Sequence, residues 1–182
     1  MENAVDRLAD IIAPPAPAGT EVNWEETVRR LRTALPTDYV QLIERYGGGQ
    51  FDGYLWLLEP GSSSDYDLAE ITEEREEALE YLWNEGEAKP AVLDAPGVRA
   101  IAWGSTDNGE YLYWLARPGD DPDAWTVLVN EARGERWEHF AMGCAEFLVT
   151  TLTGEVRSDL LWSLYPASPH EFFPSALIDH ED

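Results

Sequence analysis

The sequence predicts a single-domain α+β fold with an antiparallel-rich sheet flanked by helices. Its 182 residues fit one domain, and a chain of this length buries roughly 70% of its unfolded surface. Helical patterns dominate the first half of the chain, whereas short strand patterns joined by tight turns follow residue 98. Helices and strands thus occur in separate runs along the chain, which is typical of α+β folds.

Apolar residues at helical spacing predict five helices. A proline-rich stretch at 14–19 follows the first helix and indicates a stiff linker. Asn23 and Glu26 have the spacing of a capping box at the start of the second helix, and Pro36 separates the second helix from the third. Gly154 lies just beyond the end of the last helix. The predicted helices cover residues 4–12, 23–35, 39–46, 67–84 and 142–153.

Apolar and β-branched runs between turn residues predict five strands. Asn108 and Gly109 form a strong hairpin signal between two of them. The predicted strands cover residues 51–58, 98–104, 111–117, 125–131 and 137–140. We expect an N-terminal helix and proline-rich linker at 1–20, the α+β domain at 21–165, and a C-terminal tail without clear periodicity at 166–182.

Three consecutive glycines, Gly47 to Gly49, follow the third predicted helix directly. A phosphate-binding loop needs the order strand, glycines, helix, because the N–H groups of the helix N-terminus bind the anion. Here the helix comes first, and its C-terminus presents carbonyl groups that repel phosphate. We therefore expect a corner in which Gly47 ends the helix in a left-handed conformation and the next two glycines turn the chain into a strand.

The chain carries 36 acidic and 12 basic residues, a net charge of −24, and Lys89 is its only lysine. Such a field repels nucleic acid and anionic membranes and attracts basic proteins. Solubility or adaptation to high salt is the alternative explanation of the excess. The N-terminus lacks the basic start and apolar run of a secretory signal, and no apolar stretch approaches a membrane helix. We therefore expect a cytoplasmic protein.

The acidic residues concentrate in two regions, 65–87 and 106–123. Within the long predicted helix, Glu70, Glu74 and Glu77 fall away from the apolar face, so we expect them to be exposed. That the acidic loop residues join the same surface is a hypothesis. The predicted partner-binding residues are Asp65, Asp67, Glu70, Glu73, Glu74, Glu77, Asp107, Glu110, Asp120, Asp121 and Asp123.

No motif indicates catalysis, a metal site or a cofactor. A single cysteine, Cys144, excludes an internal disulfide, and the three histidines lack motif spacing. Asp65, Asp67 and Glu76 are spaced like calcium ligands, but Glu70 stands where the calcium loop needs glycine. We expect no enzyme, no metal and no cofactor. Carboxylate pairs beside the eight tryptophans leave a small carbohydrate-active enzyme as an alternative.

The segment LPTDYVQLIERYGGGQFDGYLWLLEP, residues 35–60, resembles the opening signature of the SUKH superfamily. This superfamily includes bacterial immunity proteins and a fungal cell-wall synthesis regulator. In the signature, Leu-Pro precedes a helix with an aromatic residue, Tyr-Gly-Gly-Gly closes that helix, and a strand follows. Residues 101–116 resemble the second block, in which a strand meets an Asn-Gly hairpin, and the likeness spans residues 24–154.

The resemblance implies an α+β fold without enzymatic activity. It also implies a bacterial immunity protein that binds and neutralises a cognate toxin, often a nuclease. Toxin-contacting residues differ between members of the superfamily, so no site residue is carried over. The basic cleft that a nuclease needs for its substrate suits an acidic inhibitor, which makes a basic toxin domain the expected partner. The alternative is a regulatory scaffold without a toxin partner, and the oligomeric state stays open.

Overall fold

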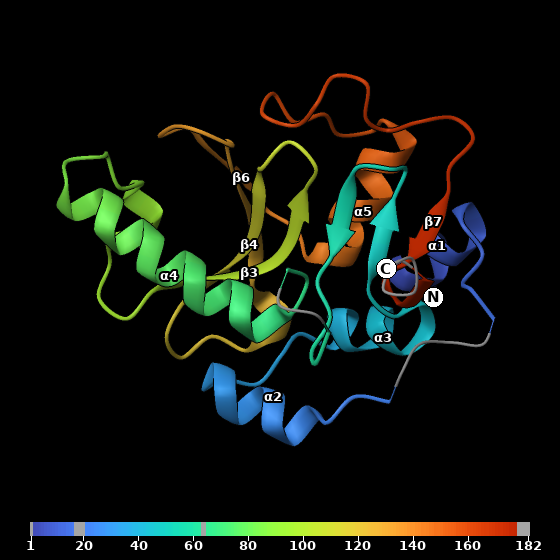
Figure 1. Ribbon diagram of the computed structural model, residues 1–182, viewed down its shortest axis with the longest axis horizontal. Helices are drawn as coiled ribbons and strands as arrows, with labels where there is room; N and C mark the ends of the chain where they lie inside the picture. The colour runs from blue at the N-terminus through green and yellow to red at the C-terminus, as the bar shows by residue number, and fades with distance from the viewer. Residues whose placement is uncertain (1, 17–20, 63–64, 178–182) are drawn as a thin grey trace.

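The computed structural model describes residues 2–16, 21–62 and 65–177, which form five α-helices around one sheet (Figure 1). The helices are α1 (Ala4–Ile11), α2 (Trp24–Leu31), α3 (Thr37–Tyr46), α4 (Leu68–Asn84) and α5 (Cys144–Thr153). The strands are β1 (Gly49–Phe51), β2 (Leu55–Leu57), β3 (Arg99–Thr106), β4 (Tyr111–Ala116), β5 (Thr126–Asn130), β6 (Trp137–Phe140) and β7 (Phe172–Pro174). Short 3-10 helices are η1 (Ala91–Leu93), η2 (Pro122–Ala124) and η3 (Ser175–Leu177).

Every pair of these strands is antiparallel, in the order β6-β5-β4-β3-β2-β1-β7. Six strands follow chain order, although α4 lies between β2 and β3 in the sequence. Leu57 pairs with Gly104, so β3 returns to β2 after the helix. The described residues thus confirm the predicted α+β fold with an antiparallel sheet.

One face of the sheet packs against α3 and α5. The indole rings of Trp103 on β3 and Trp114 on β4 are fully buried there. The Phe147 ring of α5 lies edge-on to Trp103 with ring centroids 6.1 Å apart, and the Tyr39 ring of α3 lies edge-on to Trp114 at 5.0 Å. Large aromatic side chains therefore hold these two helices on the sheet by burial and edge-to-face contacts.

The opposite face of the sheet packs against α4. The Thr72 hydroxyl donates a hydrogen bond to the Ala102 carbonyl at 3.3 Å. The Arg75 guanidinium donates to the Tyr113 hydroxyl at 3.1 Å and lies 4.4 Å from the centroid of the Tyr111 ring. Because successive strand residues point to opposite faces, the same strand packs against α3 or α5 on one face and against α4 on the other. This packing fixes which side of α4 faces solvent.

Sequence signals at the helix ends are confirmed. The Asn23 side chain accepts from the Glu26 N–H and caps α2, as its spacing predicted. Asp67, which was predicted as a partner-binding residue, instead accepts from the Glu70 N–H and caps α4. Gly154 follows α5 with a φ of 80°. The second helix is shorter than predicted, because Arg32 adopts a left-handed conformation directly after Leu31 and ends it.

The prediction of one strand over residues 51–58 is wrong. The segment forms a hairpin, in which β1 starts at Gly49 and a turn separates it from β2. Asp52 and Gly53 have φ values of 51° and 67°, and positive φ at both central positions matches the twist of a tight hairpin. The Asp-Gly pair was the signal for this turn inside a continuous apolar run.

The glycine run forms the predicted corner between α3 and β1. Gly47 has a φ of 70° and donates its N–H to the Ile43 carbonyl at 2.9 Å, which ends α3. A Cβ atom added to Gly48 would lie 2.6 Å from the Glu59 Cβ, and one added to Gly49 would overlap the Phe172 ring. The corner therefore needs one glycine for its conformation and two for close packing.

The C-terminal tail, for which the sequence showed no period, forms the seventh strand. Phe172 pairs with Phe51, and its ring lies 4.8 Å from the Phe51 ring and 5.3 Å from the Tyr46 ring between centroids. At the opposite end of the chain, the Ile12 carbonyl accepts from the Tyr46 hydroxyl at 2.7 Å. Both segments outside the predicted domain, residues 1–20 and 166–182, therefore contribute described residues that pack on it.

Asp52 in the β1–β2 turn holds the tail in place. Its carboxylate is buried and accepts hydrogen bonds from the Ala167 and Glu171 N–H groups at 3.0 and 2.8 Å. One of its oxygens also lies 2.8 Å from His170 Nδ1. A single turn residue thus positions the chain that leads into β7.

Candidate functional site

The exposed side of α4 carries an acidic stripe, defined here as Glu70, Glu74, Glu77 and Tyr81. At roughly 100° per residue, these four side chains fall within about 60° of the helix circumference. All four are exposed, and Tyr81 exposes 65% of its surface. The predicted exposure of the three glutamates is confirmed, whereas sequence reasoning missed Tyr81, which follows Glu77 by one helical turn.

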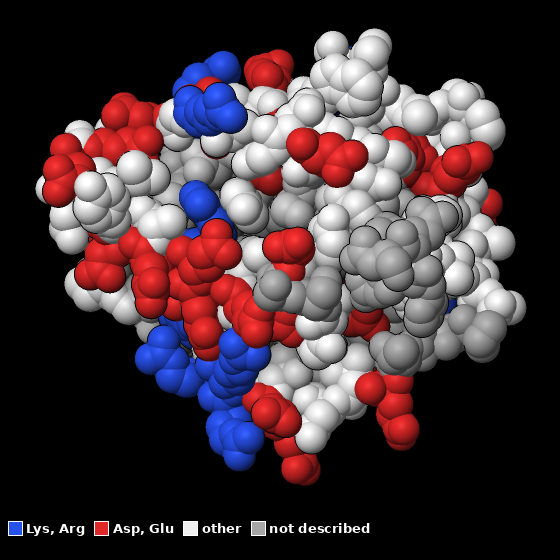
Figure 2. Space-filling view, in the orientation of Figure 1, with Lys and Arg blue, Asp and Glu red and all other residues white. Residues whose placement is uncertain are grey.

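The carboxylates of the stripe have no hydrogen bond or ion pair with any described residue. Glu73, one position off the stripe, differs, because Arg30 of α2 donates to both of its oxygens at 3.2 and 3.3 Å. The bond to Glu73 raises the pKa of the Arg30 guanidinium. Figure 2 shows acidic side chains gathered over α4 beside basic side chains over α2. Of the four predicted helix acids, Glu70, Glu74 and Glu77 are therefore free for a partner.

Two predicted residues precede the stripe and differ in exposure. Asp65 is exposed. Asp67 is only 3% exposed and accepts from the N–H groups of Glu70 and Gly61 at 2.8 and 2.6 Å. It also lies 3.6 Å from the Arg30 guanidinium. Asp67 therefore starts α4 and is not available to a partner.

The predicted acids of the β3–β4 loop bind within the protein. Asp107 accepts from Trp56 Nε1 at 2.8 Å and from Gln50 Nε2 at 3.0 Å. Glu110 is 4% exposed and accepts from the Tyr54 hydroxyl at 2.5 Å. Burial, and after it the bond to Glu110, raises the pKa of the Tyr54 hydroxyl. These acids join the β3–β4 loop to β1 and β2, so the buried Glu110 is not part of an exposed surface.

The predicted acids after β4 have capping roles. Asp121 accepts from the Asp123 N–H at 2.9 Å at the start of η2. Asp123 in turn accepts from the Thr37 N–H at 2.6 Å and from the Thr37 hydroxyl at 3.0 Å. It supplies the carboxylate at the start of α3 that Pro36 cannot provide. Asp120 is exposed.

The structure does not bring the two acidic loops together. Asp107 lies in the β3–β4 loop, next to the end of the strand pair at which Ser105 pairs with Tyr111. Asp120 lies beyond the opposite end of the same strand pair, at which Arg99 pairs with Ala116. A six-residue strand separates the loops by roughly 20 Å. The candidate site is therefore reduced to Asp65 and the acidic stripe, because the exposed loop acids lie at two separate ends of the strand pair and do not join it.

Metal binding, thiol chemistry and membrane insertion can each be compared with the described part of the chain. No group of three His, Cys, Asp or Glu side chains there could hold a metal ion. Cys144 is fully buried, and burial, followed by the nearby Asp38, raises the pKa of its thiol. Burial and the Arg117 charge lower the pKa of His139, whose Nε2 lies 2.7 Å from the Thr126 hydroxyl. Among the helices described, none is long and apolar enough to span a membrane.

Comparison with known proteins identifies the family. The model of the SMI1 / KNR4 family (SUKH-1) matches residues 19–149. Neither the curated proteins nor the solved structures give a match. Since the family model covers more than half of the chain and the fold agrees with the sequence resemblance, the chain belongs to the SMI1/KNR4 (SUKH-1) family of immunity and regulatory proteins that bind protein partners.

Proposed function

We propose that this protein is a cytoplasmic, non-enzymatic immunity protein that binds and neutralises a basic toxin domain through the acidic stripe of α4. The observation that carries the proposal is the set of three carboxylates on one exposed helix side that form no hydrogen bond or ion pair with the described residues. Family membership supports a protein partner, and the net charge of −24 supports a basic one. A nuclease toxin fits best, because its substrate cleft must be basic.

The energetics of the stripe favour a partner. Glu70, Glu74 and Glu77 follow one another at three- and four-residue spacing, and like charges at this spacing destabilise a helix by about 0.2–0.5 kcal/mol per pair. Arginine and lysine side chains of a partner would relieve this repulsion. Tyr81 lies in line with the carboxylates, and exposed aromatic residues of this kind often dominate binding energy.

The proposal is tested by reversing the charge of the stripe. The triple variant Glu70→Lys/Glu74→Lys/Glu77→Lys and the wild type would be mixed with the basic C-terminal domain of a toxin encoded beside the gene. We expect the association rate at low salt to fall by about tenfold or more, because electrostatic steering accelerates encounter by 10–10³. The salt dependence of the rate should weaken with it.

A matched control separates the stripe from the overall charge. Glu44, Asp94 and Glu135 are exposed, and their carboxylates form no hydrogen bond or ion pair with described residues. Their reversal to lysine changes the net charge by the same amount as reversal of the stripe. This control should keep most of the association rate. An unchanged rate and salt slope in the stripe variant would remove α4 from the interface.

The second candidate function within the family is a regulatory scaffold. Such a scaffold would bind a partner other than a toxin, and it would also need an exposed binding surface. Cells that express the toxin domain distinguish the two functions. An immunity protein restores their growth, and the stripe variant restores it less well than the control variant. Failure of the wild type to bind or protect against the toxin domain would favour the scaffold.

A further inference from the structure

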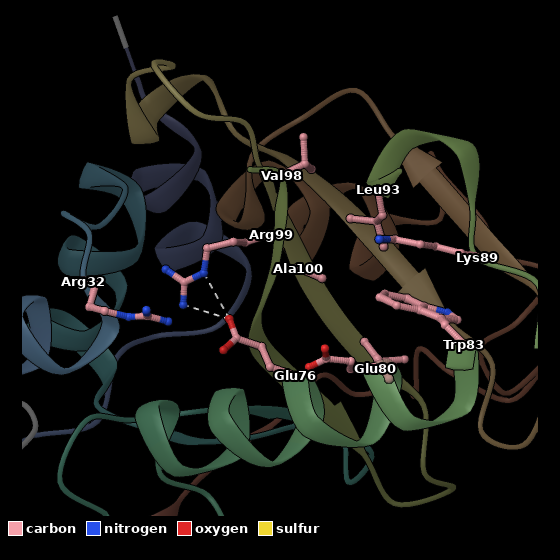
Figure 3. Close-up of a pocket in the computed structure, with 10 residues that line it drawn as sticks. Arg32, Glu76, Glu80, Trp83, Lys89, Leu93, Val98, Arg99 and Ala100 are labelled. Carbon is pink, nitrogen blue, oxygen red and sulfur yellow. Dashed lines mark hydrogen bonds and ion pairs between the residues drawn. The ribbon is translucent and has the colours of Figure 1, made fainter. Parts of the chain in front are cut away.

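A cavity of about 370 Å³ opens beside α4, on a different side of the helix from the acidic stripe (Figure 3). It lies between the second half of α4, the end of α2, the start of β3 and η1. Its lining residues are Arg32, Glu76, Leu79, Glu80, Trp83, Lys89, Leu93, Val98, Arg99 and Ala100. Cavities of this size hold small organic ligands or the end of a peptide.

The charge of the cavity is opposite to that of the chain. Acidic residues outnumber basic residues 36 to 12 in the whole sequence, whereas three basic and two acidic residues line the cavity. The three include the only lysine of the chain, Lys89. The lining of the cavity is therefore net positive in a chain that is strongly net negative.

Of the three basic side chains that line the cavity, Arg99 is already paired and held in place within the protein. Arg99 donates from Nε and Nη2 to one oxygen of Glu76 at 3.1 and 2.8 Å, and from Nη1 to the Leu31 carbonyl at 2.7 Å. These bonds hold the guanidinium rigidly in the wall between α4 and α2. Two cations, Arg32 and Lys89, then face a single acidic residue, Glu80.

Arg32 is the cation that no internal contact explains. It has a left-handed backbone with a φ of 61°, which costs a residue other than glycine roughly 1 kcal/mol. No described residue forms a hydrogen bond or ion pair with its guanidinium. Figure 3 shows the side chain reaching toward the pair of Arg99 and Glu76. The position would suit glycine, yet the chain places an unpaired charge there.

The far end of the cavity is apolar and aromatic. The Lys89 ammonium lies 4.7 Å from the centroid of the Trp83 ring, and Leu93 lies beside them (Figure 3). Leu79, which also lines the cavity, is buried. The Trp83 Nε1 donor is buried and has no acceptor among the described residues. This end can take an apolar group, while the unpaired Arg32 guanidinium can attract an acid.

We propose that the cavity binds an organic carboxylate with an apolar body, its carboxylate pairing with Arg32 and its body packing on Trp83, Leu79 and Leu93. The carboxylate belongs either to a small free acid or to the C-terminus of a peptide chain. At physiological salt the Debye length is about 8 Å, so the distant acids of the chain do little to repel such a ligand. The inference goes beyond the proposed function, because the stripe and the cavity use different side chains of α4.

Calorimetric titration of the full chain with three probes tests the proposal. The probes are 3-phenylpropanoate, an N-acetylated tripeptide with a C-terminal phenylalanine and free carboxylate, and the same tripeptide with a C-terminal amide. We expect at least one of the two free acids to bind and the amide to bind at least about tenfold more weakly, because the amide loses the charge-assisted hydrogen bonds. Binding of the tripeptide alone identifies a chain terminus as the ligand, and binding of phenylpropanoate alone identifies a small acid.

Two variants separate recognition from folding. Arg32→Gly removes the charge where glycine is the least strained residue, so the melting temperature should stay the same or rise while binding of the acids weakens about tenfold or more. Lys89→Met removes the second charge but keeps the apolar stem and should weaken binding too. Arg29→Ala, at an exposed arginine of α2 outside the cavity, is the control and should bind as the wild type does.

Three results would overturn the proposal. The first is that neither free acid binds the wild type at millimolar concentration. The second is that the amide binds as tightly as the free carboxylate. The third is that Arg32→Gly and Arg29→Ala bind the acids with equal affinity. None of these results bears on the acidic stripe, whose test uses a protein partner.

Discussion

At the scale of single residues, Gly47 carries the most demanding backbone conformation of the corner after α3. Its φ of 70° and ψ of −178° lie in a region that is open essentially to glycine alone. Asparagine tolerates the left-handed helical region, which Gly154 occupies with a φ of 80° and a ψ of 5°. The two glycines therefore differ in which residues can replace them.

We predict that Gly47→Asn lowers the free energy of unfolding by at least about 1 kcal/mol, whereas Gly154→Asn lowers it by only a few tenths. Urea denaturation of the two variants and the wild type measures both changes. Equal losses would mean that Gly47 is not held in the glycine-only region.

Cys144 illustrates how burial controls reactivity. Its Sγ is 3.5 Å from an Asp38 oxygen and is fully buried at the start of α5. Burial and the carboxylate both disfavour the thiolate, so the pKa of the thiol is raised and less thiolate exists at pH 8 than in a free cysteine. We predict that a thiol-specific disulfide reagent labels the folded protein much more slowly than the urea-unfolded protein. Rapid stoichiometric labelling of the folded chain at pH 8 would contradict this.

At the scale of elements, the helices could be predicted because their signals are local. Capping by Asn23 and helical periodicity depend on residues within one or two turns of each other. The split between β1 and β2 was missed, because three-residue strands are too short to show a period. β7 was missed for another reason, since its pairing with β1 joins segments far apart in the sequence.

The same distinction explains the candidate site. The exposure of Glu70, Glu74 and Glu77 follows from helical period and could be predicted. The burial of Glu110 and the contact of Asp67 with Arg30 could not, because both depend on tertiary contacts, such as the Tyr54 hydroxyl for Glu110. The cavity beside α4 was also invisible to sequence reasoning, since four separate elements build it.

The tail strand should contribute to stability through one side chain. Phe172 packs between Phe51 and Tyr46, whereas its neighbour Phe173 points outward and is 49% exposed. We predict that Phe172→Ala lowers the free energy of unfolding by about 2–3 kcal/mol, somewhat less than a fully buried phenylalanine would, and that Phe173→Ala has a much smaller effect. Urea denaturation compares the two. Equal losses of unfolding free energy in the two variants would show that Phe172 contributes no more to the core than the exposed Phe173 does.

At the scale of the whole molecule, the net charge of −24 opposes the compact state by self-repulsion. Added salt shortens the Debye length from about 10 Å at 0.1 M to about 3 Å at 1 M, so the melting temperature should rise with salt. This increase alone does not separate a solvated acidic surface from one shaped for a partner. These two kinds of surface are distinguished by where in the molecule the repulsion is concentrated.

We predict that Glu74→Gln/Glu77→Gln raises the free energy of unfolding at low salt by roughly 0.5–1 kcal/mol, because each glutamate repels acidic neighbours three and four positions away on α4. Glu70 is left unchanged, since the first turn of a helix favours an acidic side chain. The control Glu44→Gln/Asp94→Asn removes two exposed acids that have no acidic neighbour at this spacing.

Thermal unfolding of both variants across a salt series measures the comparison. The stripe variant should gain more than the control at low salt, and the difference should shrink at 1 M as the repulsion is screened. The association of this variant with a basic partner should slow at the same time. The two carboxylates would then favour binding of the partner while they destabilise the free protein. If both variants gain equally at every salt concentration, the acidity of α4 is part of a uniform surface charge and the stripe holds no concentrated repulsion for a partner to relieve.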